Sequence, residues 1–161
     1  MKAKLIPVYF ENSLNEEFKT MLNILKKLLP EHAEFKESCV LGSELPDADA
    51  DAVIFPVLTG DVFRCINQIK NIKLPIIIAT SDFGTVNMWD WEIVAFLKEE
   101  GVDVFSPYNL ELTKTICRSL ALKRDLKNTK FLVYQDEPGS KGMQGEIFRR
   151  FYWWEERFTK L

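Results

Sequence analysis

The residues best suited to bind a ligand follow two predicted strands of a parallel sheet. Asp82 comes shortly after the apolar run 75–79, and Gln135 comes directly after the predicted strand 130–134. Neither side chain is well placed to cap a helix, whereas a carboxylate and a carboxamide can both bind polar groups of a small molecule. In open α/β sheets, ligands bind outside the carboxyl ends of the strands. We therefore predict Asp82 and Gln135 as ligand contacts.

Other polar side chains also follow predicted strands, and helix capping is a competing interpretation for them. They are Glu11, Asn12, Thr59, Asp61, Ser81, Ser106, Asp136 and Glu137. Short polar side chains satisfy unpaired amides at helix starts, and acidic groups suit the positive end of the helix dipole. The sequence leaves both roles open at these positions.

No complete catalytic set is found in the sequence. His32 is the single histidine and lies in a polar turn, so neither a Ser-His-Asp nor a Cys-His arrangement is assembled. Residues 82–84 match the metal-binding tripeptide of protein kinases, but the rest of that signature is missing. Dinucleotide-binding and phosphate-binding glycine motifs do not occur. One acidic loop carries Asp47, Asp49 and Asp51. We predict that this loop is solvated, and ion binding is the alternative.

The stretch 74–101 predicts one strand, one loop and one helix. Its apolar run 75–79 is typical of a strand that is covered on both faces. The chain then becomes polar and bends at Gly84, and the following helix is expected to end at Gly101. Helical spacing predicts that this helix has an apolar face formed by Trp89, Ile93, Phe96 and Leu97.

The same alternation runs along the chain. Further strands are predicted at 4–10, 33–41 (at an edge of the sheet), 52–58, 102–105 and 130–134. Helices are predicted to start near Ser13, Thr59 and Asn109, although Pro56 cannot donate a ladder hydrogen bond within its strand. This order predicts an α/β, doubly wound, mainly parallel sheet in a flavodoxin-like or Rossmann-like three-layer domain.

Composition narrows the class of protein. A net charge of -3 argues against a nucleic-acid-binding surface, and no apolar run is long enough to span a membrane. The three cysteines contain no Cys-x-x-Cys pair, which favours reduced thiols and a cytoplasmic location.

The last part of the chain differs from the rest. We assign residues 1–138 to the α/β domain and residues 139–161 to a glycine-rich loop and an aromatic helix. One stripe of that helix is expected to carry Ile147, Phe151, Trp154 and Phe158. Because its aromatic side chains exceed what one face can bury, the tail predicts a partner surface or a continuation into downstream domains.

Three segments together carry a resemblance to a known family. They are residues 87–92 (NMWDWE), residues 94–97 (VAFL) with Gly101, and residues 130–133 (KFLV) before a glycine-bearing loop. The chain from residue 74 to 161 resembles the amino-terminal domain of the L-fucose isomerase-like and L-arabinose isomerase sugar isomerases. The pair Met88-Trp89 is the most distinctive part. The arabinose-isomerase form has Ser-Pro and Lys before this pair, whereas residues 84–87 here are GTVN, which favours the fucose-isomerase-like branch or a divergent group.

The resemblance implies a role without catalysis in these 161 residues. Members of the family are oligomeric enzymes that interconvert aldoses and ketoses with manganese or another divalent metal, whose ligands lie in later domains. This domain would recognise the sugar and help to assemble a homo-oligomer. Trp89 or Trp91 would contact the sugar ring, and Asp82 or Asn87 its hydroxyl groups, with core packing as the alternative for both tryptophans. The alternative function is a free-standing flavodoxin-like module that binds a small ligand or a partner protein.

Overall fold

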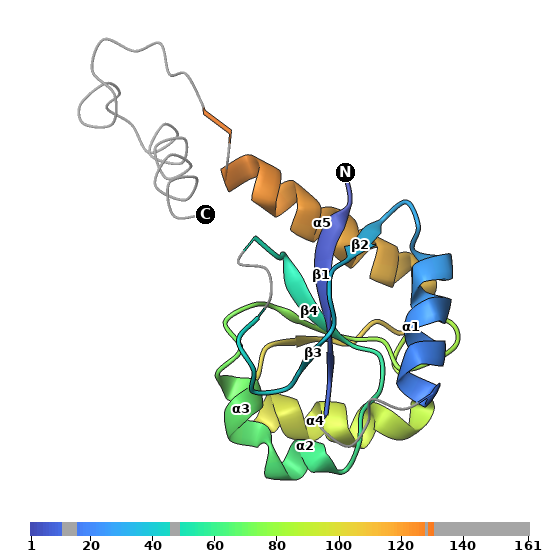
Figure 1. The fold of residues 1–161 in the computed structure, drawn as a ribbon, viewed down its shortest axis with the longest axis vertical. Coiled ribbons are helices and arrows are strands. Elements are labelled where there is room, and N and C mark those ends of the chain that lie inside the picture. The colour runs from blue at the N-terminus through green and yellow to red at the C-terminus, as the bar shows by residue number, and fades with distance from the viewer. Residues whose placement is uncertain (11–15, 46–48, 128, 131–161) are drawn as a thin grey trace, which may run out of the picture. The chain divides into compact units, whose positions relative to one another are not determined.

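The first compact unit of the chain is built around a parallel sheet. The computed structural model describes residues 1–10, 16–45, 49–127 and 129–130. It divides the chain into unit 1–122 and unit 123–161. The strands found in the described residues are β1 (Ala3–Tyr9), β2 (Ala33–Phe35), β3 (Cys39–Val40), β4 (Ala52–Phe55), β5 (Ile76–Ile78) and β6 (Val104–Phe105). Their order is β2-β1-β4-β5-β6 with β3 also beside β1, and every pairing is parallel (Figure 1).

Helices cover both faces of this sheet. They are α1 (Glu16–Leu28), α2 (Asp61–Arg64), α3 (Ile66–Lys70), α4 (Trp91–Glu99) and α5 (Leu110–Lys127), with a 3₁₀ helix, η1 (Met88–Asp90), before α4. Leu25 of α1 shares one core with the buried side chains of α5, and the buried side chains of α2, α3 and α4 share another. The other buried side chains of α1 form a third cluster with Val57. The strand order reverses between β1 and β4, as in doubly wound sheets. The predicted α/β, flavodoxin-like three-layer fold is confirmed.

Strand β4 shows why the apolar runs in the sequence are continuous. Ala52 and Ile54 point into the core under α1 and α5, whereas Val53 and Phe55 point into the core under α2, α3 and α4. All four side chains are fully buried. Because successive side chains of a strand alternate between faces, a strand with helices on both sides must be apolar at every position.

The strand predicted at 33–41 lies at the sheet edge, but it is interrupted. Ala3 pairs with Ala33, and Val8 pairs with Cys39, so β1 advances by five residues (3 to 8) while its neighbour advances by six (33 to 39). One extra residue is therefore accommodated between β2 and β3, as in a β-bulge. The prediction for 52–58 was also too long, because β4 ends at Phe55, directly before Pro56.

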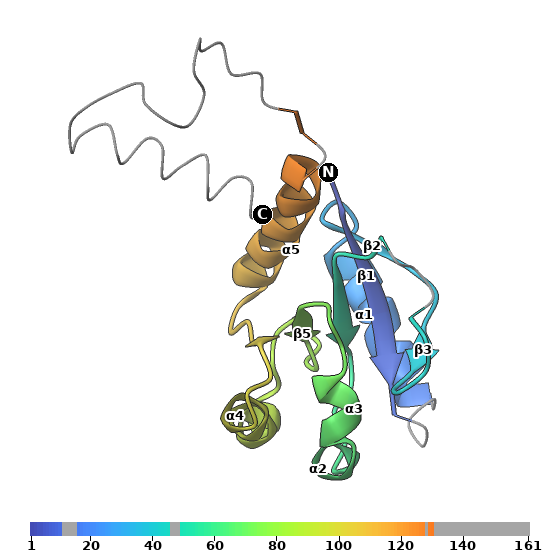
Figure 2. The same ribbon diagram turned by 90° about the vertical axis from the view of Figure 1, so that its left-hand side faces the viewer.

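Two helix predictions need correction. The helix expected after Thr59 is divided at Cys65 into the short helices α2 and α3, which Figure 2 shows one after the other. The predicted apolar face that begins at Trp89 is wrong for that residue. Trp89 belongs to η1 and is exposed, whereas the buried residues of α4 are Val94 and Leu97. The 3₁₀ turn changes the angular spacing, so the period used for the prediction does not extend back to Trp89.

Other predicted elements fall outside the part of the chain that the structure describes. These are the capping sequence that begins at Ser13, residues 131–134 of the last predicted strand, and the tail 139–161. Among the described helices, none is both long and apolar enough to cross a membrane.

Candidate functional site

The loop between β5 and η1 is anchored to the sheet domain at Gly84. The backbone of Gly84 has φ +70, a conformation that side chains with a Cβ rarely adopt. A Cβ at this position would lie 3.2 Å from Cδ1 of Leu110 and 3.3 Å from Cδ1 of Leu28. The buried hydroxyl of Thr113 donates a hydrogen bond to the Gly84 carbonyl over 2.6 Å. The loop therefore requires a glycine where it packs against α1 and α5.

Ser81 closes a tight turn within this loop. Its backbone amide donates to the Thr85 carbonyl over 2.9 Å, and its carbonyl accepts from the Gly84 amide over 2.9 Å. The Ser81 and Thr85 hydroxyl oxygens lie 2.7 Å apart in a further hydrogen bond. The turn leaves Asp82 and Phe83 exposed at its tip. The hydroxyl groups of Ser81 and Thr85 are thus already bonded to each other.

Thr80 connects the end of β5 to both ends of η1. Its hydroxyl donates to Oδ2 of Asp90 over 2.5 Å and accepts from the backbone amide of Asn87 over 3.0 Å. Asn87 then caps η1, because its Oδ1 accepts from the Trp89 amide over 3.2 Å. Thr80 is 8% exposed, so these bonds are largely shielded from water. The buried hydroxyl of Thr80 therefore fixes the 3₁₀ turn that carries Trp89 and leads into Trp91.

The apolar side chains of this region project outward. Trp89 is 79% exposed and Trp91 41% exposed, at the junction of η1 and α4. Phe83, Met88 and Tyr108 are each at least 70% exposed. The loop of Tyr108 is joined to the first loop, because the Val86 amide donates to the Pro107 carbonyl over 2.9 Å. We name Phe83, Met88, Trp89, Trp91 and Tyr108 the aromatic rim.

Four of the five predicted contact residues lie in this one segment. The loop carries Asp82 and Asn87, η1 carries Trp89, and α4 begins at Trp91. Asp82 makes no hydrogen bond with another described residue, whereas the Asn87 Oδ1 is used as a helix cap. Both tryptophans are exposed, which differs from the core-packing alternative. Gln135 lies outside the described residues.

Thr80, Asp90 and Thr113 were missed as positioning residues by sequence reasoning. They join segments 7 to 29 residues apart along the chain. A polar residue directly after a buried apolar run was the available signal for Thr80.

The polar residues after the other strands serve local structure. Thr59 accepts from the Asp61 amide over 3.3 Å, and Asp61 pairs with Arg64 over 2.6 Å. Ser106 accepts from Lys98 over 3.2 Å. These are local contacts, but the N-cap of α2 is Gly60, and α2 has no side-chain capping bond. Glu11, Asn12, Asp136 and Glu137 lie outside the described residues.

The thiols of Cys39 and Cys117 are not poised as nucleophiles. Burial raises the pKa of Cys117 to about 11 and also raises the pKa of Cys39, so both remain protonated near neutral pH. Cys39, Cys65 and Cys117 are free cysteines. The described residues bring together no group of three or more His, Cys, Asp or Glu side chains that fits a metal ion. The divalent ion implied by the resemblance therefore has no donor set within that part of the chain.

A scan of protein-family models, a search of the curated proteins and a search of the solved structures each found no match to this chain.

Proposed function

We propose that this chain is the amino-terminal substrate-recognition and assembly domain of a cytoplasmic, metal-dependent aldose-ketose isomerase of the L-fucose isomerase-like type. In this proposal the domain is inactive alone, and the divalent metal and proton-transferring groups belong to further domains. The observation that carries the proposal is the exposure of Trp89 and Trp91 at the junction of η1 and α4, in the same segment of the chain as the exposed Asp82. The sequence resemblance of residues 74–161 selects the enzyme class.

The chemistry of the aromatic rim suits a sugar. A pyranose has hydroxyl groups around its edge and C–H groups on its faces, so it binds well to an indole face combined with polar acceptors. The indole ring supplies a large rigid apolar surface at little entropic cost. A carboxylate such as Asp82 forms charge-assisted hydrogen bonds with hydroxyl groups. Residues 81–92 carry three acidic side chains and no Lys or Arg, which favours a ligand that donates hydrogen bonds.

The turn also suits selective recognition because its geometry is fixed before binding. Thr80 holds Asn87 and Asp90, the residues that bracket Met88 and Trp89. A preorganised site loses less conformational entropy when its ligand binds. The domain would thus contribute affinity and orientation, while bond rearrangement takes place on groups outside these residues.

A second candidate function rests on the extent of the aromatic rim. Phe83, Met88 and Tyr108 add exposed apolar surface beyond what one sugar ring covers. Contiguous exposed apolar surface is typical of protein-binding sites. In a homo-oligomer this rim would face a neighbouring subunit, with the sugar bound between them. As a free-standing module, the domain would use the same rim to bind a partner protein.

The first test measures sugar binding by the 161-residue chain. L-fucose and L-arabinose are titrated by isothermal calorimetry, and tryptophan emission is followed in parallel. We expect saturable binding that Trp89→Ala weakens about fivefold, since one aromatic contact contributes on the order of 1 kcal/mol. Phe63→Ala is the matched control, because Phe63 is exposed but packs on Phe96 of α4. Equal affinities of both variants would contradict the assignment of Trp89.

The second test uses the longest open reading frame that contains this chain. In that enzyme, Trp89→Ala and Asp82→Asn should raise KM for the aldose several-fold and leave kcat nearly unchanged, as expected for lost substrate binding. An unchanged KM in both variants would reject the sugar contacts. Binding of the chain to a different protein, in place of any sugar, would favour the module.

A further inference from the structure

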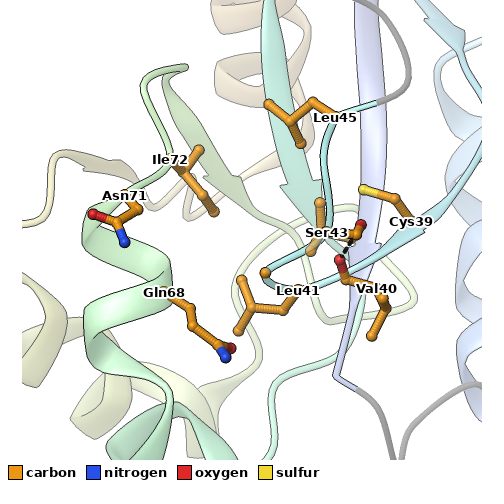
Figure 3. Close-up of a pocket in the computed structure, with 10 residues that line it drawn as sticks. Cys39, Val40, Leu41, Ser43, Leu45, Gln68, Asn71 and Ile72 are labelled. Atoms are coloured by element: carbon orange, nitrogen blue, oxygen red, sulfur yellow. Dashed lines mark hydrogen bonds between the residues drawn. The ribbon is translucent and has the colours of Figure 1, made fainter.

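A pocket that is separate from the aromatic rim lies beside the sheet edge. It has a volume of about 170 Å³ and is formed by β1, β3, the chain after β3, and α3 with the two residues that follow it (Figure 3). Its inner wall is apolar. Val8 and Leu41 are buried, and Ile72 is half-buried. An apolar cavity of about 150 Å³ is known to hold benzene. The pocket therefore has the size for a molecule built on a single six-membered ring.

Two carboxamides provide the polar part of the lining. Gln68 and Asn71 are three residues apart at the end of α3, so they lie on the same side of that segment. Neither side chain makes a hydrogen bond with another described residue, and each offers both donors and an acceptor. In Figure 3 the Gln68 side chain points toward Leu41 and Val40. The lining thus combines an apolar wall with unused amide groups.

Gly42 and Ser43 keep this side of the pocket open. A Cβ at Gly42 would lie 3.1 Å from Cδ of Gln68, and Gly42 has φ +88, so a larger residue is disfavoured there. The Ser43 hydroxyl donates to the Val40 carbonyl over 2.7 Å. The donor of this hydroxyl is therefore used within the protein.

The described lining carries no charged side chain. A charged ligand would lose hydration without gaining an ion-pair partner, which is unfavourable. Burial raises the pKa of Cys39, which keeps its thiol neutral as well. The electrostatic character of the pocket therefore selects neutral molecules.

We propose that this pocket is a binding site for a small neutral molecule that has one apolar ring and one group able both to donate and to accept hydrogen bonds, such as a carboxamide. The ring occupies the wall formed by Val8, Leu41 and Ile72, and its polar group pairs with Gln68 and Asn71. This site shares no residue with the aromatic rim, so it is independent of sugar recognition.

Benzamide and benzoate are the matched probes, because they have the same shape and differ in charge. Each is titrated into the ¹⁵N-labelled chain, and amide shifts are followed by NMR. Benzamide should give saturable shifts at Leu41, Gly42, Gln68 and Asn71, and benzoate should bind at least tenfold more weakly. Equal affinity for benzoate, or the absence of benzamide shifts at these four residues, would overturn the proposal.

Variants test the two carboxamides. The double substitution Gln68→Leu and Asn71→Leu removes the hydrogen-bonding groups at exposed positions while it retains side-chain bulk. Affinity for benzamide should fall about tenfold, as expected for lost hydrogen bonds. Asn67→Leu is the control, since Asn67 is an exposed residue of α3 outside the described pocket lining. A similar affinity in the double variant and in the control would also overturn the proposal.

Discussion

The loop after β5 and the pocket beside β3 arrange polar and apolar groups in opposite ways. In the loop, the hydroxyls of Thr80 and Ser81 are bonded inside the protein, and the aromatic rim faces water. In the pocket, apolar side chains form the inner wall, and the carboxamides of Gln68 and Asn71 are left unbonded among the described residues. The loop offers an open surface for stacking, whereas the pocket offers a partly enclosed site for a ring.

Because of this difference, substitutions in the two regions should affect the stability of the fold and the binding of a ligand to different extents. In the loop, the groups that fix the site are buried, so their removal should affect folding and recognition together. In the pocket, the carboxamides are exposed and unpaired, so their removal should affect binding and leave folding nearly unchanged. The following predictions test this separation.

The largest effect is expected for Gly84→Ala. The substitution adds a Cβ at positive φ and brings it within 3.3 Å of Leu110 and Leu28. The left-handed conformation costs about 1–2 kcal/mol, and crowding about 1 kcal/mol more. We expect the free energy of unfolding, measured with urea, to fall by about 2–3 kcal/mol.

Gly101→Ala is the matched control for this prediction. Gly101 has φ +77, but a Cβ there meets no atom within 4 Å. Only the conformational cost of about 1–2 kcal/mol applies. If the free energy of unfolding falls equally in both variants, the packing of Gly84 against α1 and α5 contributes nothing to stability.

An intermediate effect is expected for Thr80→Val. The substitution keeps the shape of the side chain but removes the hydroxyl that bonds to Asp90 and Asn87. We expect a loss of about 1–2 kcal/mol in the free energy of unfolding. Tryptophan anisotropy should also decrease, because η1 loses its anchor.

Two variants control the Thr80 prediction. Thr80→Ser restores the hydroxyl and should recover the anisotropy. Thr115→Val removes an exposed hydroxyl of α5 and should change stability by less than about 0.5 kcal/mol. Normal anisotropy in Thr80→Val would show that the hydroxyl does not position the tryptophans.

The smallest effect is expected for the pH dependence of stability, through Cys117 in the core shared by the sheet and α5. Cys117 is fully buried, and burial raises its pKa to about 11, above the value near 8.5 of an unfolded thiol. A raised pKa means that the unfolded state loses its proton first, so stability is retained below about pH 8.5 and falls as pH rises toward 11. Between pH 8 and pH 9 the expected loss is on the order of 0.5–1 kcal/mol. Urea unfolding at both pH values measures it.

Cys117→Ala isolates this contribution from other groups that titrate in the same range. The variant should be less stable at pH 8 because it leaves a small cavity, but its stability should depend less on pH. An identical pH dependence in both proteins would mean that Cys117 does not titrate differently on folding.

Much of the fold was predictable because its signals are local. Apolar runs located β4 and β5, the Asn109 cap located the start of α5, and positive φ at Gly84 and Gly101 agrees with the predicted bends. Each of these signals depends on residues within a few positions of one another. The parallel topology then follows from the alternation of strands and helices.

The direction of Trp89 was not predictable in this way. It depends on η1, and η1 depends on hydrogen bonds from Thr80, which lies seven residues before Asn87 and ten before Asp90. Helical periodicity therefore gave the wrong face for this side chain. The pocket was not predicted from the sequence either. Two of its lining residues, Cys39 and Gln68, are far apart in the chain, and neither belongs to a recognisable motif.

The extra residue between β2 and β3 determines which chemistry the pocket contains. Directly paired strand residues point to the same side of a sheet, so the pairing of Val8 with Cys39 turns the thiol toward the pocket. With the register of β2 continued unchanged, Ser38 would take that place, and Cys39 would point to the opposite face. Deletion of one residue among positions 36–38 would remove the extra residue and still leave Cys39 opposite Val8, because Cys39 would then follow Phe35 by three positions as Val8 follows Leu5. The number of residues between β2 and β3 therefore sets which side chain of this edge lines the pocket.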